Sequence, residues 1–177
     1  MPLRTHVLHR EQRLDGAPEE VFGFFADTKN LEAITPPLLR FSVITPEPIA
    51  MRVGTLIGYR LRVHGVPISW LTSIQAWEPP HRFVDLQVSG PYALWHHTHV
   101  FAADGPQHTL MTDTVRYAVG LGPLGELAHR LVVRRDLERI FAHRARVIGP
   151  LLAADGETRA SAPAREPSST GAVSQGR

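Results

Sequence analysis

The sequence contains no cysteine among its 177 residues. Disulfide bonds, thiolate-ligated zinc, iron–sulfur clusters and cysteine nucleophiles are therefore excluded. No apolar run approaches the ~18 residues that a membrane span needs, and residues 1–6 lack the apolar stretch of a signal peptide. We therefore expect a soluble, cytoplasmic protein with no integral membrane segment.

Lysine is nearly absent: Lys29 is the only one, and arginine supplies the other long cationic side chains. The formal net charge is only +2, and acidic residues are interspersed with the basic ones. A nucleic-acid-binding protein usually shows a clustered basic stripe, so we expect no nucleic-acid partner. Apolar residues make up 43% of the chain, which is enough for a sizeable core without a disulfide or a metal ion.

The sequence also lacks the motifs of nucleophilic catalysis and of dinucleotide binding. It has no Gly-x-Ser-x-Gly elbow and no recognisable serine–histidine–acid arrangement. The glycine-rich segment 120–125 resembles a dinucleotide fingerprint only loosely, because it contains Pro123 and follows a strand that we expect to be antiparallel. We interpret its glycines as a hinge between the last strand and a helix, and we expect no cofactor.

The length fits one domain followed by a tail. Residues 153–177 are rich in small and polar residues and have no apolar period. Such a segment cannot bury enough surface to offset the entropy of ordering it. We therefore predict one domain over residues 3–152 and a disordered tail over residues 153–177.

Within the domain, hydrophobic periodicity and turn residues predict a strand, two short helices, six strands and a long helix. Asp27 is expected to cap the second short helix. Tight turns rich in Gly and Pro join the strands, which is typical of an antiparallel meander. The strands are predicted at 6–14, 41–44, 56–63, 68–77, 83–88, 92–102 and 108–119, and the helices at 18–25, 28–34 and 124–152.

Eight apolar residues define the expected buried side of the long helix. Arg130 and Arg134 fall within the same stripe on an ideal helix, so either the helix bends near Val133 or the arginines lean out over its edge. The sequence leaves both possibilities open. The eight apolar residues are Leu124, Leu127, Leu131, Leu137, Ile140, Phe141, Ile148 and Leu152.

A sheet with one apolar face must cover that face, and the long helix is the only large element left to do so. The sequence therefore predicts an α+β helix-grip fold, in which a curved seven-stranded antiparallel sheet and two short helices enclose the long C-terminal helix. A space between sheet and helix commonly binds an apolar molecule. We expect an internal apolar cavity that holds a small hydrophobic ligand.

Several runs carry a resemblance to a known superfamily, and they are Trp77–Asp85, Gly90–Tyr92, Trp95–His99, Thr109–Asp113 and Arg134–Phe141. With them the chain resembles the START/Bet v 1-like helix-grip proteins, also called SRPBCC or polyketide cyclase/dehydrase-like, and especially their bacterial stand-alone members. The resemblance covers residues 4 to 150. It implies the fold and a ligand cavity, but this superfamily includes lipid carriers, hormone receptors, quinone-binding proteins and cyclases, so it implies no single activity.

The most unusual local feature is the histidine-rich run that contains His97 and His99. On a strand these two side chains share a face with the large aromatic residues Trp95 and Phe101, which indicates that this face points inward. If Phe101 pairs near Met111 in the next strand, His99 lies close to Asp113. A carboxylate beside an imidazole fixes its tautomer and raises its pKa, as an acid/base pair would need.

Four interpretations of this cluster remain open. His97 and His99 are structural histidines satisfied by Asp113 or by the backbone, or polar anchors for the headgroup of a ligand. General acid/base catalysis by His97, His99 and Asp113 is the third interpretation. A metal site is disfavoured, because His-x-His on one strand supplies two ligands and no clear third one beyond Asp113; we assign no metal.

The predicted ligand-binding residues lie on the more apolar faces of their elements, where they form the core and the cavity wall together. Asp85 is out of phase with its apolar neighbours Val84, Leu86 and Val88, so we expect it to point outward or to lie at a rim. The predicted ligand-binding residues are Tyr59, Leu61, Trp70, Ile74, Trp95, His97, His99, Phe101, Met111, Asp113, Tyr117 and Phe141.

The leading hypothesis is binding or transport of a small hydrophobic molecule, such as a lipid, a quinone or a polyketide-like aromatic. The alternative is a cofactor-free cyclase or dehydratase that uses His97, His99 and Asp113 as acid/base groups. A third hypothesis is a module that binds another protein through its outward strand faces or its arginine-rich helix, for example in a homodimer.

Overall fold

The structure, a computed structural model, describes the backbone of residues 3–161 and the side chains of residues 3–157. Its strands form one antiparallel sheet, as predicted, and their order in the sheet is β1-β7-β6-β5-β4-β3-β2. Short helices follow β1, and helices end the described chain. The elements are β1 (His6–Asp15), α1 (Pro18–Ala26), α2 (Thr28–Ala33), η1 (Pro37–Leu39), β2 (Ser42–Val43), β3 (Leu56–Val63), β4 (Val66–Glu78), β5 (Arg82–Ser89), β6 (Leu94–Ala103), β7 (His108–Ala118), α3 (Gly122–Ala128), η2 (His129–Val133) and α4 (Arg134–Ser161).

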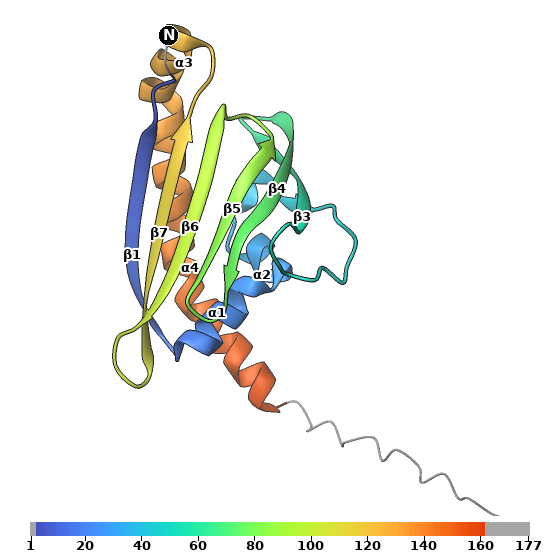
Figure 1. Cartoon of the computed structure of the whole chain (residues 1–177), viewed down its shortest axis with the longest axis vertical. Coiled ribbons are helices and arrows are strands. Elements are labelled where there is room, and N and C mark those ends of the chain that lie inside the picture. The colour runs from blue at the N-terminus through green and yellow to red at the C-terminus, as the bar shows by residue number, and fades with distance from the viewer. Residues whose placement is uncertain (1–2, 162–177) are drawn as a thin grey trace, which may run out of the picture.

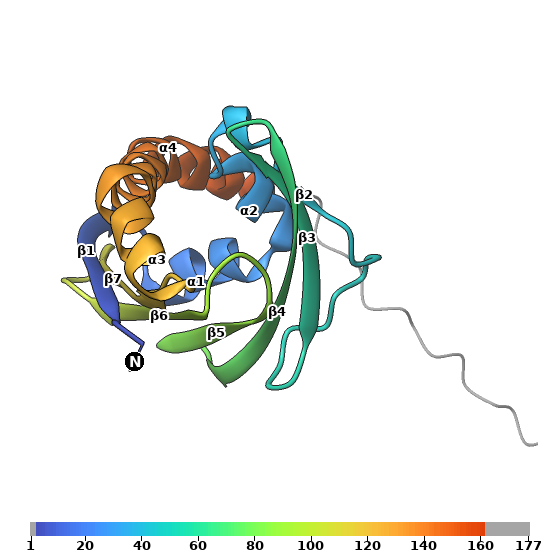
Figure 2. The ribbon, with the colours of Figure 1, turned by 90° about the horizontal axis from the view of Figure 1, so that it is seen from above.

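The sheet is strongly curved, and α4 runs along its concave side (Figure 1). Seen from above, the sheet bends from β1 round to β3, and α2 and α4 lie across from its middle strands (Figure 2). The first strand closes one edge by pairing with the last one, from His6 opposite Tyr117 to Asp15 opposite His108. This arrangement confirms the predicted α+β helix-grip class.

The two short helices form where the sequence predicts them. Pro18 begins α1, and the carboxylate of Glu20 accepts a hydrogen bond of 3.2 Å from the backbone N–H of Ala17. Asp27 caps α2 as predicted, because its carboxylate accepts a hydrogen bond of 2.9 Å from the backbone N–H of Lys29. The inner face of α1 packs its phenylalanines on the sheet. The ring centroids of Phe22 and Phe101 lie 5.4 Å apart.

The C-terminal helical region differs from the single helix that we predict. A π-helical segment, η2, separates α3 from α4. A π turn inserts an extra residue, so the apolar stripe after it is rotated relative to the stripe before it. This change of phase explains why Arg130 and Arg134 point to solvent, although an ideal helix would place them in the apolar stripe. Both arginine side chains are about two-thirds exposed, at 66% and 69%.

The first half of the predicted apolar stripe is wrong. Leu124, Leu127 and Leu131 are exposed, whereas Leu137 and Phe141 are buried against the sheet. The later positions Ile148 and Leu152 are buried in the core around α1. Exposed leucines on α3 and η2 suit the third hypothesis, although nothing in the structure shows what covers them, and a homodimer stays a prediction.

The predicted boundary after Leu152 is also not where the helix ends, because α4 continues to Ser161. The remainder of the predicted tail, residues 162–177, lies outside the described residues. In the part of the chain that the structure describes, no helix is long and apolar enough to cross a membrane.

We expect a chain that ends after Leu152 to keep its stability. Ala153 and Gly156 are exposed, so removal of this end of α4 should change the free energy of unfolding by less than about 1 kcal/mol, or about 2–4 °C in the melting temperature. Differential scanning calorimetry of both chains measures this. A larger fall would show that residues beyond Leu152 pack against the domain.

Candidate functional site

The concave side of the sheet, α2 and α4 enclose a cavity of about 210 Å³. Strand β3 contributes alternate side chains to it, Ile57, Tyr59 and Leu61, because successive residues of a strand point to opposite faces. From the other side, α4 contributes Leu137 and Phe141, which lie one turn apart. The wall is therefore mostly apolar and comes from elements far apart in the sequence.

Aromatic rings form one side of this cavity. Trp70 and Trp95 meet edge to face, with ring centroids 5.2 Å apart and planes at 89°. Tyr92 packs on Trp95 at 4.9 Å and on Trp70 at 5.6 Å. Such contacts stabilise aromatic pairs beyond the burial of their area. Tyr92 is not among the predicted ligand-binding residues, because the strand predicted over 92–102 puts it out of phase with Trp95; in the structure it lies in the loop before β6.

Eight of the twelve predicted ligand-binding residues line the cavity. The other four lie behind its wall: Phe101 and Met111 are in the core under α1, Asp113 is behind the histidines, and Tyr117 is at the end of β7. The eight residues at the cavity are Tyr59, Leu61, Trp70, Ile74, Trp95, His97, His99 and Phe141.

The two histidines point inward from β6, on the side that the sequence analysis predicts. Phe101 pairs with Met111 and His99 with Asp113, so the predicted register is confirmed. One carboxylate oxygen of Asp113, Oδ1, lies 2.9 Å from Nε2 of His97 and 2.7 Å from Nδ1 of His99. The two imidazole rings are adjacent, with centroids 3.8 Å apart. All three residues are buried.

Asp85, which the sequence predicts to point outward or to lie at a rim, instead lines the cavity and completes this cluster. Its Oδ2 lies 3.2 Å from Nε2 of His99 and 3.6 Å from Nδ1 of His97. The apolar residues that alternate with Asp85 on β5, namely Val84, Leu86 and Val88, point to the convex face of the sheet instead. Val88 is 57% exposed there. The signal that points to Asp85 is the pairing of β5 with β6, which places Phe83 opposite His99 and Asp85 opposite His97.

The cluster is a closed network of two carboxylates and two imidazoles. Burial acts to raise the pKa of Asp113, but the imidazoles of His99 and His97 outweigh it and hold this pKa well below its ordinary value. The pKa of Asp85 is lowered in the same way, mainly through its hydrogen bond with His99. Both carboxylates are therefore ionised at neutral pH.

The two imidazoles shift in opposite directions. Burial and the charge of His99 lower the pKa of His97. Burial also acts on His99, but the carboxylates of Asp113 and Asp85 outweigh it and raise its pKa. The two carboxylates thus favour protonation of His99, whereas burial and the charge of His99 favour the neutral form of His97.

Arg144 brings a cationic side chain from α4 to the cavity wall. Its guanidinium lies 5.2 Å from the centroid of the Phe141 ring. The buried Nε finds no hydrogen-bond partner in the described part of the chain. An unsatisfied buried donor is costly, and other atoms of the same side chain line the cavity, where the charge of Arg144 can meet the polar group of a ligand.

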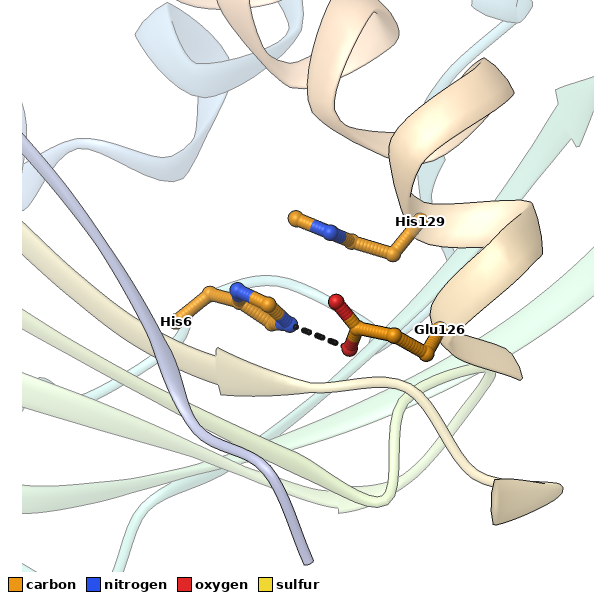
Figure 3. Close-up of side chains that lie close together, drawn as sticks. All are labelled: His6, Glu126 and His129. Carbon is orange, nitrogen blue, oxygen red and sulfur yellow. Dashed lines mark hydrogen bonds and ion pairs between the residues drawn. The ribbon is translucent and has the colours of Figure 1, made fainter. Parts of the chain in front are cut away.

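A second polar cluster lies near the C-terminal end of β7, where β1 meets α3 (Figure 3). Nε2 of His6 lies 3.1 Å from Oε2 of Glu126, and the rings of His6 and His129 stack at 3.5 Å. The hydroxyl of Tyr117 lies 2.9 Å from Nε2 of His129. This hydrogen bond holds the hydroxyl end of Tyr117 against the helical region, and Tyr117 is not part of the cavity wall.

Burial and the neighbouring charge of His6 lower the pKa of His129, whereas the carboxylate of Glu126 opposes this shift. We therefore expect His129 to titrate below the ordinary pKa of histidine in an NMR titration of its imidazole. Replacing Glu126→Gln should lower the pKa further, because it removes the anion that favours the protonated ring. Glu19→Gln, on the exposed face of α1, should leave it unchanged. A pKa that rises in Glu126→Gln would contradict this electrostatic description.

No family model and no curated protein matches the sequence. Solved structures do match it. Zhui aromatase/cyclase from Streptomyces sp. R1128 is similar with a TM-score of 0.67 at 14% identity, over 90% of this chain and 98% of that chain. A point mutant of norcoclaurine synthase from Thalictrum flavum, in complex with a transition-state analogue, gives 0.65 at 14% identity over 88% and 99%.

A START superfamily protein from Mycobacterium smegmatis gives a TM-score of 0.60 at 14% identity, over 82% of this chain and 99% of that chain. At these identities the likeness shows the fold alone. The predicted helix-grip fold of the START and Bet v 1-like proteins is thereby confirmed.

Proposed function

We propose that this chain, a START-like helix-grip protein by its fold, binds one small apolar molecule in the cavity between its sheet and α4. The observation that carries the proposal is the cavity of about 210 Å³ itself, because its wall is apolar and rich in aromatic rings. A folded protein rarely keeps such a space without a use, since empty volume loses packing contacts. Concave apolar sites with a few convergent polar groups are the usual form of a ligand site.

The ligand's polar end would meet the side of the cavity where Asp85, His97, His99 and Arg144 converge. The nitrogens of His97 and His99 face the two aspartates, so the guanidinium of Arg144 is the donor left for a ligand, and an oxygen acceptor is the group that suits it. The aromatic side formed by Trp70 and Trp95 suits a flat apolar body. An aromatic or polyketide-like molecule with one oxygen-bearing end fits both sides better than an unsubstituted hydrocarbon.

Two related fluorescent probes test this proposal. We expect 8-anilino-1-naphthalenesulfonate and its neutral relative N-phenyl-1-naphthylamine each to bind saturably, one molecule per chain, with a rise in fluorescence. Arg144→Gln should weaken binding of the sulfonate several-fold and leave the neutral probe nearly unchanged, because only the sulfonate uses the guanidinium. Arg139→Gln, exposed on the same helix, is the matched control. Linear, unsaturable binding of both probes would contradict the proposal.

A second candidate is a cofactor-free cyclase or dehydratase. The specific observation in its favour is the network of His97, His99 and the two aspartates, whose imidazole pKa values are shifted apart. Groups with pKa values shifted apart suit the roles of acid and base. We expect such an enzyme to catalyse exchange of the methyl protons of acetophenone for deuterium, a reaction that NMR follows directly. Exchange no faster than in buffer, or equally fast in His99→Gln, would leave only binding.

A further inference from the structure

We propose that Asp85, His97 and His99 form a binding site for one divalent transition-metal ion such as Zn²⁺, with Asp113 supporting the two histidines from behind. This inference goes beyond the proposed function and does not require the apolar ligand. One ligand atom from each of the three residues lies within 4.8 Å of the others. Two imidazoles and one carboxylate are the donor set of many catalytic zinc sites.

The spacing of the donor atoms supports the site. Two ligands on a tetrahedral Zn²⁺ with bonds of about 2.0–2.1 Å lie about 3.3 Å apart. Oδ2 of Asp85 lies 3.2 Å from Nε2 of His99 and 3.6 Å from Nδ1 of His97. These two separations bracket the required one, and all three donor atoms lie within 4.8 Å of one another.

Asp113 is placed as a supporting carboxylate. A histidine that ligates a metal usually donates its other N–H to a carboxylate, which fixes the tautomer. Oδ1 of Asp113 faces Nε2 of His97 at 2.9 Å and Nδ1 of His99 at 2.7 Å, which are the nitrogens turned away from Asp85. The contact with His99 is short but poorly directed as a hydrogen bond, since its Nδ1 has no aligned partner. A small rotation of the imidazole on coordination would align it.

The cavity leaves room for further ligands. Asp85, His97 and His99 all line it, whereas Asp113 does not. A water molecule or the oxygen of a bound molecule could therefore take the remaining coordination position, as in zinc sites that keep an open position. The sequence alone disfavours a metal, because it shows no clear third ligand beyond Asp113; Asp85 supplies that ligand.

The second polar cluster has the same donor types but a less suitable setting. The guanidinium groups of Arg4 and Arg130 lie 3.4 and 3.5 Å from Oε1 of Glu126. Two cations that already neutralise the carboxylate would repel a divalent ion. At the cavity, Arg144 is the only arginine among the lining residues of the described chain, and its charge acts on Asp85 from a distance, because the ion pairs of Asp85 are with His97 and His99.

Titration of the metal-free, untagged chain with Zn²⁺ in a calorimeter tests the proposal. We expect one ion per chain, and with Co²⁺ a visible absorption spectrum typical of nitrogen and oxygen ligands. Asp85→Asn should weaken Zn²⁺ binding by at least about tenfold, and Asp113→Asn by about 10- to 100-fold as a supporting group. Glu126→Gln should leave binding unchanged.

The absence of stoichiometric binding to the wild-type chain would overturn the proposal, as would a loss of binding in Glu126→Gln instead of Asp85→Asn. X-ray absorption of the wild-type Zn²⁺ complex gives a test that needs no variant, and two imidazole ligands are expected. A zinc shell without two imidazoles would also overturn it. Binding of N-phenyl-1-naphthylamine by the metal-free chain tests the proposed function separately, so the two failures are distinguishable.

Discussion

Asp113→Ala is expected to lower the free energy of unfolding by about 3–5 kcal/mol, because removing one partner of a buried ion pair leaves the other uncompensated. His97 and His99 both depend on the carboxylate of Asp113, and all three are buried. That loss is a large share of the about 5–15 kcal/mol that stabilises a typical domain. Urea unfolding followed by circular dichroism measures it.

Asp104→Ala is the matched control for this prediction. Asp104 also accepts from a cationic partner, with its Oδ2 2.6 Å from Nε of Arg13, but both side chains are about half exposed. An exposed pair contributes only about 0–1 kcal/mol, so this variant should be nearly as stable as the wild type. Equal losses in the two variants would show that the buried network has no special role in stability.

Leu61→Trp is expected to reduce binding of N-phenyl-1-naphthylamine at least tenfold, which corresponds to about 1.4 kcal/mol of binding free energy. Leu61 is buried and lines the cavity from the middle of β3. A tryptophan there would occupy much of the space that the probe needs. Part of the added volume fills the cavity, so we expect any overpacking to cost no more than about 1–3 kcal/mol of stability.

Arg62→Trp provides the comparison, because Arg62 is the next residue on the same strand and points outward to solvent. Fluorescence titration of the two variants should show nearly unchanged binding in Arg62→Trp. If both variants bind the probe as the wild type does, the probe does not enter the cavity.

The fold could be predicted because period-two apolar alternation and Gly/Pro turns mark nearly every strand, and a single long helix remains to cover the sheet. The register of β6 on β7 followed from the short turn between them, which places Phe101 opposite Met111. With the register known, the proximity of His99 and Asp113 followed directly. Apolar alternation and turn length, which are local features of the sequence, therefore suffice to predict the register of β6 on β7 and the proximity of His99 to Asp113.

The role of Asp85 could not be predicted from its own strand. Val84, Leu86 and Val88 form the more apolar set on β5, yet it is Phe83 and Asp85 that face the cavity. An inward carboxylate is stabilised only by partners on β6 that the sequence of β5 does not reveal. The orientation of Asp85 can be predicted only when the pairing of β5 with β6 is known.

The prediction of the buried side of the long helix was wrong for a related reason. The apolar stripe was read with one helical period, and the π-helical segment from His129 to Val133 changes the phase within it. Leu124, Leu127 and Leu131 therefore face outward, although the pattern alone assigns them to the core. A single inserted turn is not visible in apolar periodicity.

A crystal structure of the chain with N-phenyl-1-naphthylamine tests the central claim most directly. We predict one probe molecule between the sheet and α4, with its rings against Trp70 and Trp95. A probe found only on the exposed leucines of α3 and η2, with the cavity unchanged, would contradict the account and would favour a surface for another protein.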